Sequence, residues 1–428
     1  MIPEARERYD QVCIGKTPQG YKQTAVGVVP QEWNEFSLGE IYTERKQAGD
    51  PSMPVLSVSI HSGVSEGELD EESLGKKVKR IEDKTQYRTA LEGDLVFNMM
   101  RAWQGAIGVV RNRGLVSPAY IVAKPGDQVY PPFMDYYMQT PRMINLIQRM
   151  SYGVTDFRLR LYWDSFEQIP CVLPPLQEQQ KIADILSACD RLIALRQNCL
   201  EELKQLKKTC LAKMFPRDGA DVPELRFPGF TAPWEQRKLG DLVQFSKGTG
   251  YSKSDLKESG TPIILYGRLY TKYETVIADV DTFANAKTGS VYSRGGEVIV
   301  PASGETAEDI SIASVVEKPG VLLGGDLNII TPLGDLDSTF LAISITNGKP
   351  HSDMAKMAQG KSVVHLHNTD LEKINLSYPS HKEQLQISAF FRHIDTLITL
   401  HQRELEAEQQ KKKALMQLLL TGLVRVPN

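Results

Sequence analysis

Three clusters of residues combine side chains and spacings that catalytic or metal sites use. Gly15-Lys16-Thr17 and Gly360-Lys361-Ser362 end like a phosphate-binding loop, and His365-Leu366-His367 would place two imidazoles on one face of a strand. The phosphate loop requires a glycine five residues earlier, where this chain has Asp10 and Ala355. Zinc needs a third ligand, and none is evident near the two histidines. These clusters predict neither a nucleotide site nor a metal site.

A fourth cluster, Tyr130-Pro131-Pro132-Phe133, has the form of the Pro-Pro loop of adenine methyltransferases. That loop needs a side-chain acceptor in its first position for the adenine amino group, and Tyr130 supplies a phenol instead. No glycine-rich cofactor loop precedes it. Because proline favours the first positions of a helix, we expect Pro131 and Pro132 to begin a helix over residues 133–150. No Ser/His/Asp set or carboxylate pair stands out, so the sequence predicts no catalytic centre.

Composition narrows the class of protein further. The chain has 428 residues, 41% of them hydrophobic and 24% charged, which suits two or three globular domains. No apolar run is long enough to span a bilayer and residues 1–10 are polar, so we expect a cytoplasmic protein. Five cysteines without a C-x-x-C pair favour neither disulfides nor zinc. A net charge of -3 means that any nucleic-acid contact relies on local basic residues or on a partner.

The strongest feature of the chain is an internal repeat. An offset of 205 residues aligns 15 identical pairs among the 48 ungapped positions from 169 to 216, where chance would give roughly three. Weaker matches align Trp33 with Trp234 at an offset of 201, and residues 93–96 with 296–299 at an offset of 203. Between these positions the halves share little. The chain is therefore a tandem repeat of one unit, in which a globular region of variable sequence is followed by a helix of shared sequence.

Both shared helices are evident from the residue pattern. One follows Pro174-Pro175 and runs about 36 residues to Phe215-Pro216, and the other follows Pro379 and ends at Thr421-Gly422. Two apolar stripes of heptad spacing in one chain favour antiparallel pairing within the chain. Two ordinary core helices are the alternative. The residues expected to pair the helices are Ile182, Ile185, Cys189, Leu192, Leu203 and Leu206, with Ile387, Phe390, Ile394 and Leu397.

Taken together, these pieces resemble the specificity subunit of type I restriction-modification systems over nearly the whole chain. The resemblance rests on residues 173–179 and 379–384 at the two helix starts, and on the Trp-containing segments 30–39 and 227–240. Residues 93–98 add to it. Each piece is weak alone, whereas their order and repetition are specific. The second copy departs locally, with Ser380-His381 where the first has Pro175-Leu176.

The resemblance implies an α+β fold in which two mixed α/β target recognition domains are joined by two long helices. These form an antiparallel coiled coil with pseudo-twofold tandem symmetry. The expected boundaries are an N-terminal arm 1–30, recognition domains 31–175 and 217–378, and spacer helices 176–216 and 379–428. A helix of about 36 residues is about 54 Å long, of the order of 15 base pairs. The two halves differ, so an asymmetric bipartite target is expected.

The resemblance also implies a subunit without catalytic activity or cofactor of its own. It would bind double-stranded DNA and dock two modification (methyltransferase) subunits, and through them restriction subunits. S-adenosylmethionine, ATP and Mg would belong to those partners. No membrane contact is implied.

Candidate DNA-binding residues are basic, amide and aromatic side chains in the expected loops, because arginine, lysine and glutamine match phosphates and base edges. In the first half they are Lys76, Lys77, Lys79, Arg80, Arg88, Arg101, Trp103, Gln104, Arg158 and Arg160. In the second half they are Lys247, Tyr251, Arg268, Tyr270, Lys361, His365 and His367.

Two other classes of protein compete with this hypothesis. A restriction or methyltransferase enzyme would need the cofactor loop that the chain lacks. A coiled-coil scaffold that binds proteins but not DNA fits the slight acidity. It does not explain why two domains of divergent sequence are attached to helices of shared sequence.

Overall fold

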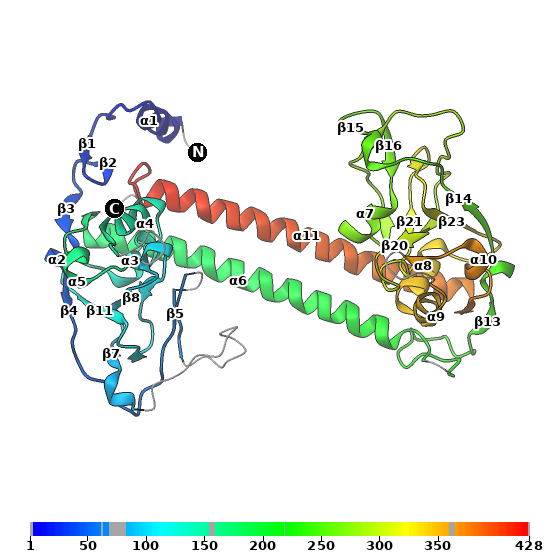
Figure 1. Ribbon diagram of the computed structural model, residues 1–428, viewed down its shortest axis with the longest axis horizontal. Coiled ribbons are helices and arrows are strands. Elements are labelled where there is room, and N and C mark those ends of the chain that lie inside the picture. The colour runs from blue at the N-terminus through cyan, green and yellow to red at the C-terminus, as the bar shows by residue number, and fades with distance from the viewer. Residues whose placement is uncertain are drawn as a thin grey trace. The chain divides into compact units, whose positions relative to one another are not determined.

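The computed structural model describes residues 3–60, 63–67, 83–153, 159–217, 219–358 and 364–426. It divides into two compact units, Met1–Leu195 with Leu405–Asn428, and Arg196–Glu404. Two long helices, α6 (Leu176–Lys213) and α11 (His381–Leu419), each contribute residues to both units (Figure 1). In the described ranges no helix is both long and apolar enough to cross a membrane.

The first unit is built on an antiparallel sheet in the order β4-β11-β8-β9. These strands are β4 (Tyr42–Glu44), β8 (Leu95–Asn98), β9 (Ile107–Val109) and β11 (Tyr120–Pro125). A separate pair joins β3 (Asn34–Ser37) to β12 (Pro170–Leu173). The other elements are α1 (Pro3–Cys13), β1 (Tyr21–Thr24), β2 (Gly27–Pro30), α2 (Leu38–Ile41), β5 (Val58–Ser59), β6 (Gly63–Val64), β7 (Arg88–Ala90), β10 (Gly114–Val116), α3 (Pro131–Tyr137), α4 (Pro141–Met150) and α5 (Trp163–Phe166).

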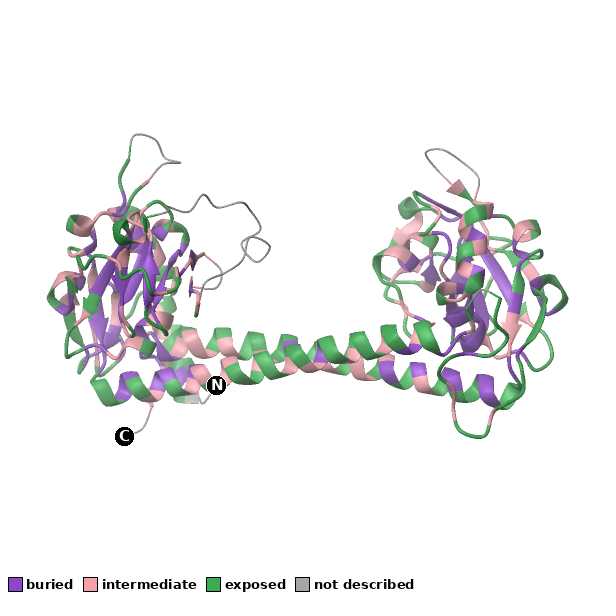
Figure 2. Cartoon of the chain, turned by 90° about the horizontal axis from the view of Figure 1, so that it is seen from below, coloured by how far each residue is buried: buried purple, intermediate pink, exposed green. Residues whose placement is uncertain are grey.

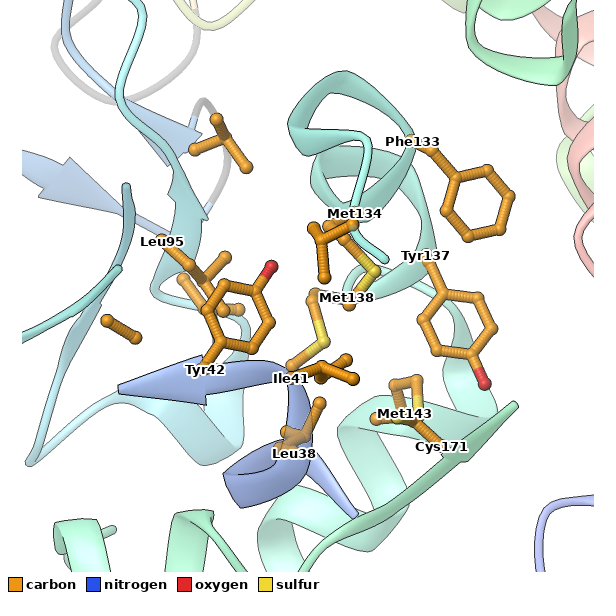
Figure 3. Packing of buried hydrophobic residues seen from close by; sticks show 14 of the residues in the cluster. Leu38, Ile41, Tyr42, Leu95, Phe133, Met134, Tyr137, Met138, Met143 and Cys171 are labelled. Carbon is orange, nitrogen blue, oxygen red and sulfur yellow. The ribbon is translucent and has the colours of Figure 1, made fainter. Parts of the chain in front are cut away.

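Apolar side chains from sheet and helices fill the interior of this unit. Figure 3 shows Tyr42 and Leu95 of the sheet packed with Met134 and Met138 at α3. The expected single helix over residues 133–150 is wrong. Pro141 cannot donate the backbone hydrogen bond that a continuous helix needs, so α3 ends at Tyr137 and α4 begins anew at Pro141.

The second unit repeats this plan. Its main sheet has the order β14-β23-β19-β21-β17, and β13 pairs with β25. The bounds are β13 (Glu235–Lys238), β14 (Val243–Lys247), β17 (Val276–Ile277), β19 (Glu297–Pro301), β21 (Ser314–Val316), β23 (Leu327–Pro332) and β25 (Asn375–Tyr378). The other elements are β15 (Leu256–Lys257), β16 (Thr261–Ile264), α7 (Tyr266–Thr271), β18 (Phe283–Ala284), β20 (Ser303–Gly304), β22 (Leu322–Leu323), α8 (Ser338–Asn347), α9 (Lys349–Met357), β24 (Val364–His365) and α10 (Asn368–Leu371).

The two units share topology where their sequences share little. Strands β4, β11, β8 and β9 correspond in order and direction to β14, β23, β19 and β21. The short sequence match before β8 and β19 has a structural cause. Gly93 and Gly296 both adopt positive φ, and the next residue, Asp94 or Glu297, accepts backbone hydrogen bonds in the same turn. The fold class expected from the sequence is confirmed, while the five domain boundaries stay a prediction.

The seam between the long helices follows a strict heptad pattern that the repeat carries over. Along α6 one series of less exposed positions is spaced alternately by four and three residues, and adding 205 gives a matching series on α11. Figure 2 shows buried residues concentrated in the globular regions, and mainly half-buried and exposed ones along the helices. The seam positions of α6 are Ile182, Leu186, Cys189, Ile193, Arg196, Leu200, Leu203, Lys207 and Cys210, and those of α11 are Ile387, Phe391, Ile394, Ile398, His401, Leu405, Glu408, Lys412 and Leu415.

Five of the residues expected to pair the helices lie one position before the seam: Ile185, Leu192, Leu206, Phe390 and Leu397. Leu192 and Leu206 are 36% and 48% exposed, and the seam runs through Ile193 and Lys207 instead. A hydrophobic pattern alone selects leucine over lysine. In the structure the lysine ammonium reaches Asp395, so that its aliphatic stem can occupy a seam position.

Charged pairs fix the antiparallel register of the helices within each unit. Lys207 pairs with Asp395 in the second unit, and the repeat-related Lys412 pairs with Asp190 in the first. A third pair, Arg196–Glu404, lies nearer the middle of the helices. Residue numbers in these pairs rise on one helix as they fall on the other, which is the signature of antiparallel pairing.

A buried glutamate ties the start of each long helix to a distant segment. Glu178 accepts two hydrogen bonds from Arg425, at 2.6 and 2.8 Å, and one from the Trp33 indole at 3.2 Å. In the second unit Glu383 accepts two from Arg226, both at 2.7 Å. We call each arrangement a clasp. Each clasp closes its unit with the segment that follows the other long helix.

The glutamine that follows each buried glutamate makes an equivalent repeated contact. Gln179 Nε2 donates to the Pro174 carbonyl and Gln384 Nε2 to the Pro379 carbonyl, both at 2.9 Å. Their Oε1 atoms accept from the backbone N–H of Tyr130 and Asp337, the residues just before α3 and α8. These contacts fix the direction of each long helix relative to its own globular region.

Removing the arginine of each clasp should destabilise the two units unequally. Arg226 is 11% exposed and is the sole described side-chain partner of Glu383, so Arg226→Ala should cost about 3–5 kcal/mol. Arg425 is 34% exposed and Trp33 still donates to Glu178, so Arg425→Ala should cost about 1–3 kcal/mol. Urea unfolding measures both. Arg294→Ala, an exposed arginine, is the control. Equal losses for the two clasp variants would contradict this ranking.

Candidate nucleic-acid interface

One buried leucine holds a corresponding surface segment in each unit. The Leu161 N–H donates to the Met99 carbonyl at 2.9 Å, and the Leu366 N–H donates to the Ala302 carbonyl at 3.0 Å. Both leucines are fully buried, and both acceptors directly follow the corresponding strands β8 and β19. We call residues 159–162 and 364–367 the anchored segments. Each one leads directly into a short helix, α5 or α10.

The first anchored segment exposes a cation among aromatic rings. Arg160 is exposed, and its backbone exchanges two hydrogen bonds with Tyr152, at 2.9 and 3.0 Å. Tyr162, on the other side of Leu161, packs its ring against that of Tyr152 with centroids 5.1 Å apart. The guanidinium of Arg160 makes no ion pair with any described residue. It therefore presents its donors to solvent from a fixed backbone.

The second anchored segment exposes two histidines in parallel. The rings of His365 and His367 have centroids 6.5 Å apart and an interplanar angle of 3°. Strand β24 pairs with β20, and the Asn328 side chain, fully buried, donates to the Leu366 carbonyl at 2.9 Å. The backbone between the two histidines is therefore held on both sides.

Lys247 lies at the end of β14 near this segment and is exposed. The Asn368 side chain donates to the carbonyl of Ser246, at 3.2 Å, which links the end of β14 to the residue after His367. The structure thus brings three candidates, Lys247, His365 and His367, to one end of the second unit.

The loop after β8 presents two of its three candidate residues. Arg101 and Gln104 are exposed, whereas Trp103 packs partly against the core and donates to the Met100 carbonyl at 3.1 Å. The Gln139 side chain donates to the backbone carbonyls of Gly105 and Ile107, at 3.1 and 2.6 Å, and these hydrogen bonds fix the end of the loop.

Other candidates have structural partners. Arg88 pairs with Glu44 at 3.2 Å. The Tyr251 ring is buried and its hydroxyl hydrogen-bonds Ser290, while the Tyr270 hydroxyl donates to the Ser303 carbonyl. Burial raises the pKa of Tyr270 above its usual value. Six candidates, Lys76, Lys77, Lys79, Arg80, Arg158 and Lys361, lie outside the described residues.

The expectation that Arg268 contacts DNA is corrected by its surroundings. Its side chain is 7% exposed, and it pairs with Asp281 and with Glu274 while donating to the Asp279 carbonyl at 2.9 Å. Hydrogen bonds from Lys272 and then Arg268 lower the pKa of Asp281 to about 2. A guanidinium whose donors face these acceptors is not available to a base edge. Residue type alone does not distinguish this arginine from Arg160.

Three residues of the candidate interface were not predicted from the sequence: Tyr152, Tyr162 and Asn328. A usable signal existed for one segment. The offset of 205 extends upstream of residue 169 and aligns Leu161 with Leu366, which makes Arg160 and Tyr162 the counterparts of His365 and His367. Nothing in the local sequence marks Asn328, because its contact spans 38 residues.

Comparison with known proteins identifies the repeated unit. A family model described as "Type I restriction modification DNA specificity domain" matches residues 30–205 and again 232–409. The type I restriction enzyme MjaVIII specificity subunit of Methanocaldococcus jannaschii is 26% identical over 275 residues, covering 61% of this chain and 64% of that protein. The match thus spans less than two thirds of that relative. The putative MjaX specificity subunit of the same organism is 24% identical over 377 residues, covering 85% and 86%.

Two solved structures share the fold. One, from work on complex assembly and conformational transition of the type I R-M system, has a TM-score of 0.52 at 18% identity and covers 92% of this chain and 99% of the other. The S subunit of a type I restriction-modification system from M. genitalium has a TM-score of 0.53 at 13% identity, covering 92% and 97%. At these identities the likeness supports the fold alone.

Arg268 should prove structural when it is replaced. Arg268→Met leaves the Asp279 carbonyl and the Glu274 carboxylate without their donor, so unfolding free energy should fall by about 1–2 kcal/mol. The loss should shrink as pH falls from about 4 toward 2. Asp281 has a depressed pKa, so its stabilising charge is present above the ordinary carboxyl range and disappears on acidification. Thermal unfolding measures this, with Lys247→Met as the exposed control. An unchanged melting temperature for Arg268→Met would contradict the assignment.

Proposed function

This chain belongs to the family of type I restriction modification DNA specificity domains, and from that premise we propose that it is a non-catalytic specificity subunit. In this proposal it binds double-stranded DNA at an asymmetric bipartite target. The observation that carries the proposal is one fold occurring twice with different side chains at corresponding surface positions. The alternative of a coiled-coil scaffold without DNA recognition finds no support, because the matching model describes a DNA specificity domain.

Different exposed chemistry in the two units supports an asymmetric target. Sequence is recognised by side chains that contact base edges, whereas phosphate contacts mainly set position. The first unit exposes Arg160, Arg101 and Gln104, and the second exposes Lys247 and two histidines. Such different donors and acceptors favour different base pairs.

The paired helices suit the role of a spacer. At 1.5 Å per residue, the 38 residues of α6 extend about 57 Å, comparable to about 17 base pairs of DNA. The repeated ion pairs prevent one helix from sliding along the other, since a shift would separate Lys207 from Asp395. In our proposal the separation of half-sites follows from this length.

Partners complete the proposed activity. Two copies of the unit suit two modification subunits, and through them restriction subunits. The net charge of -3 favours phosphate contacts made largely by these partners. S-adenosylmethionine, ATP and Mg are assigned to the partner subunits. Among the described residues, no cluster of three His, Cys, Asp or Glu side chains could hold a metal ion. A cytoplasmic location remains our expectation.

Methylated-adenine mapping tests the function. Genomic DNA is compared between cells with and without this gene, in the presence of the modification subunits. One bipartite motif with unequal halves should lose methylation when the gene is deleted. A methylome that does not change on deletion would refute the assignment.

Lengthening both helices should lengthen the target. Seven residues are inserted between 199 and 200 and seven between 400 and 401, positions that face each other near the Cys199–His401 contact. The seam stays in phase, and the extra 10.5 Å or so corresponds to about three base pairs. Methylome sequencing should show a spacer longer by about three base pairs.

The matched control inserts the same seven residues into the segment 217–233, outside both helices. That variant should keep the original spacer. An unchanged spacer in the variant with two lengthened helices would show that the helices do not set the separation of half-sites.

A further inference from the structure

The geometry points to the two anchored segments as the base-recognition positions of the two half-sites. We propose that Arg160 with Tyr162 determines specificity in one half-site and that His365 with His367 determines it in the other. This inference rests on the proposed function and deepens it, because it assigns recognition to one corresponding position in each unit.

Correspondence between the units is the first support. The two segments are 205 residues apart in sequence. In each, the buried leucine donates a hydrogen bond to the residue that follows a central strand, and a helix of four residues comes directly after the segment. A fold that occurs twice presents corresponding surface positions to corresponding parts of its ligand. If one anchored segment meets a base edge, the same placement is expected for the other.

Rigidity of the backbone is the second support. Base recognition requires that side-chain donors be held within a few tenths of an ångström, and rigid elements achieve this better than free loops. Leu161 is fixed by its own N–H, and Arg160 by two hydrogen bonds to Tyr152. Leu366 is fixed by its N–H and by the Asn328 side chain on its carbonyl. The buried leucine holds the segment while its neighbours remain accessible.

The side chains on these fixed backbones carry hydrogen-bond donors and acceptors that can pair with base edges. An arginine can donate two hydrogen bonds to guanine O6 and N7, and a bidentate contact of this kind is worth roughly tenfold or more in discrimination. A neutral histidine offers one donor and one acceptor, so two parallel histidines present a pattern that an arginine cannot copy. Arg268, by contrast, is occupied by carboxylates in the same unit as the histidines. What distinguishes Arg160 from Arg268 is therefore whether the guanidinium donors are free of partners among the described residues, and not the residue type.

Exchanging the chemistry between segments tests the assignment. Arg160→His and the double variant R160H/Y162H place histidine in the first segment, and H365R/H367Y does the reverse in the second. Each full-length chain is assembled with its modification subunits in cells that lack the native gene. Methylome sequencing then measures the base preference at every position of the motif.

Each variant should alter one half-site alone. The first two should shift preference by roughly tenfold or more at one or two base pairs of one half, and H365R/H367Y should do so in the other half. Matched controls change the same residue types at exposed positions elsewhere in each unit, Arg149→His on α4 and His393→Arg on α11. The controls should leave the motif unchanged. Because the exchanged side chains are exposed or half-buried, melting temperatures should match those of the controls.

Two results separate this inference from the proposed function. If the unaltered chain directs methylation of a bipartite motif but all exchange variants keep that motif, the recognition positions lie elsewhere and the inference is overturned. A variant that weakens both half-sites equally overturns it as well. If the unaltered chain directs no bipartite methylation, the proposed function itself fails.

Discussion

A carboxylate buried at the start of each long helix is the constraint on which the rest of the structure depends. Leaving such a group buried without a cation costs several kcal/mol, so Glu178 and Glu383 require their arginines. Those arginines come from the segment that follows the other long helix. Each unit is therefore closed by both helices. The neighbouring glutamines extend the same constraint to the backbone before α3 and α8.

The seam between the helices adds a second constraint, which is symmetric at its ends and asymmetric at its centre. The pairs Lys207–Asp395 and Lys412–Asp190 are related by the repeat. At the centre, the repeat maps Arg196–Glu404 onto His401 and Cys199, whose side chains lie 4.0 Å apart. The centre thus contains the Arg196–Glu404 ion pair on one side and the Cys199–His401 contact on the other, with His401 Nδ1 3.5 Å from the Glu404 carboxylate. Polar residues at seam positions specify register, which suits helices that must hold a defined length.

Periodicity and the repeat predicted the long helices and their antiparallel pairing, because these depend on local pattern, whereas the α+β fold class was what the family resemblance implied. Long-range contacts were not predictable in the same way. Arg226 and Arg425 lie 157 and 247 residues from their glutamates, and nothing in their local sequence separates them from exposed arginines. Arg268 is the opposite case: its sequence suggested an exposed DNA-binding arginine, whereas its guanidinium is buried and paired with carboxylates. Lys207 shows that hydrophobicity alone misplaces a seam by one residue where a lysine finds a partner. The strand order that the two units share could not be derived from identities, because burial patterns and not identities maintain it.

In the proposed function, two equivalent units joined by one pair of helices recognise two parts of a target independently. Replacing residues 31–168 with the corresponding region of a relative of different specificity tests this claim most directly. The retained Glu178–Arg425 pair and the seam should keep the spacer and the other half-site unchanged, and methylome sequencing should show one new half-site. A change in both half-sites, or in neither, would contradict the account.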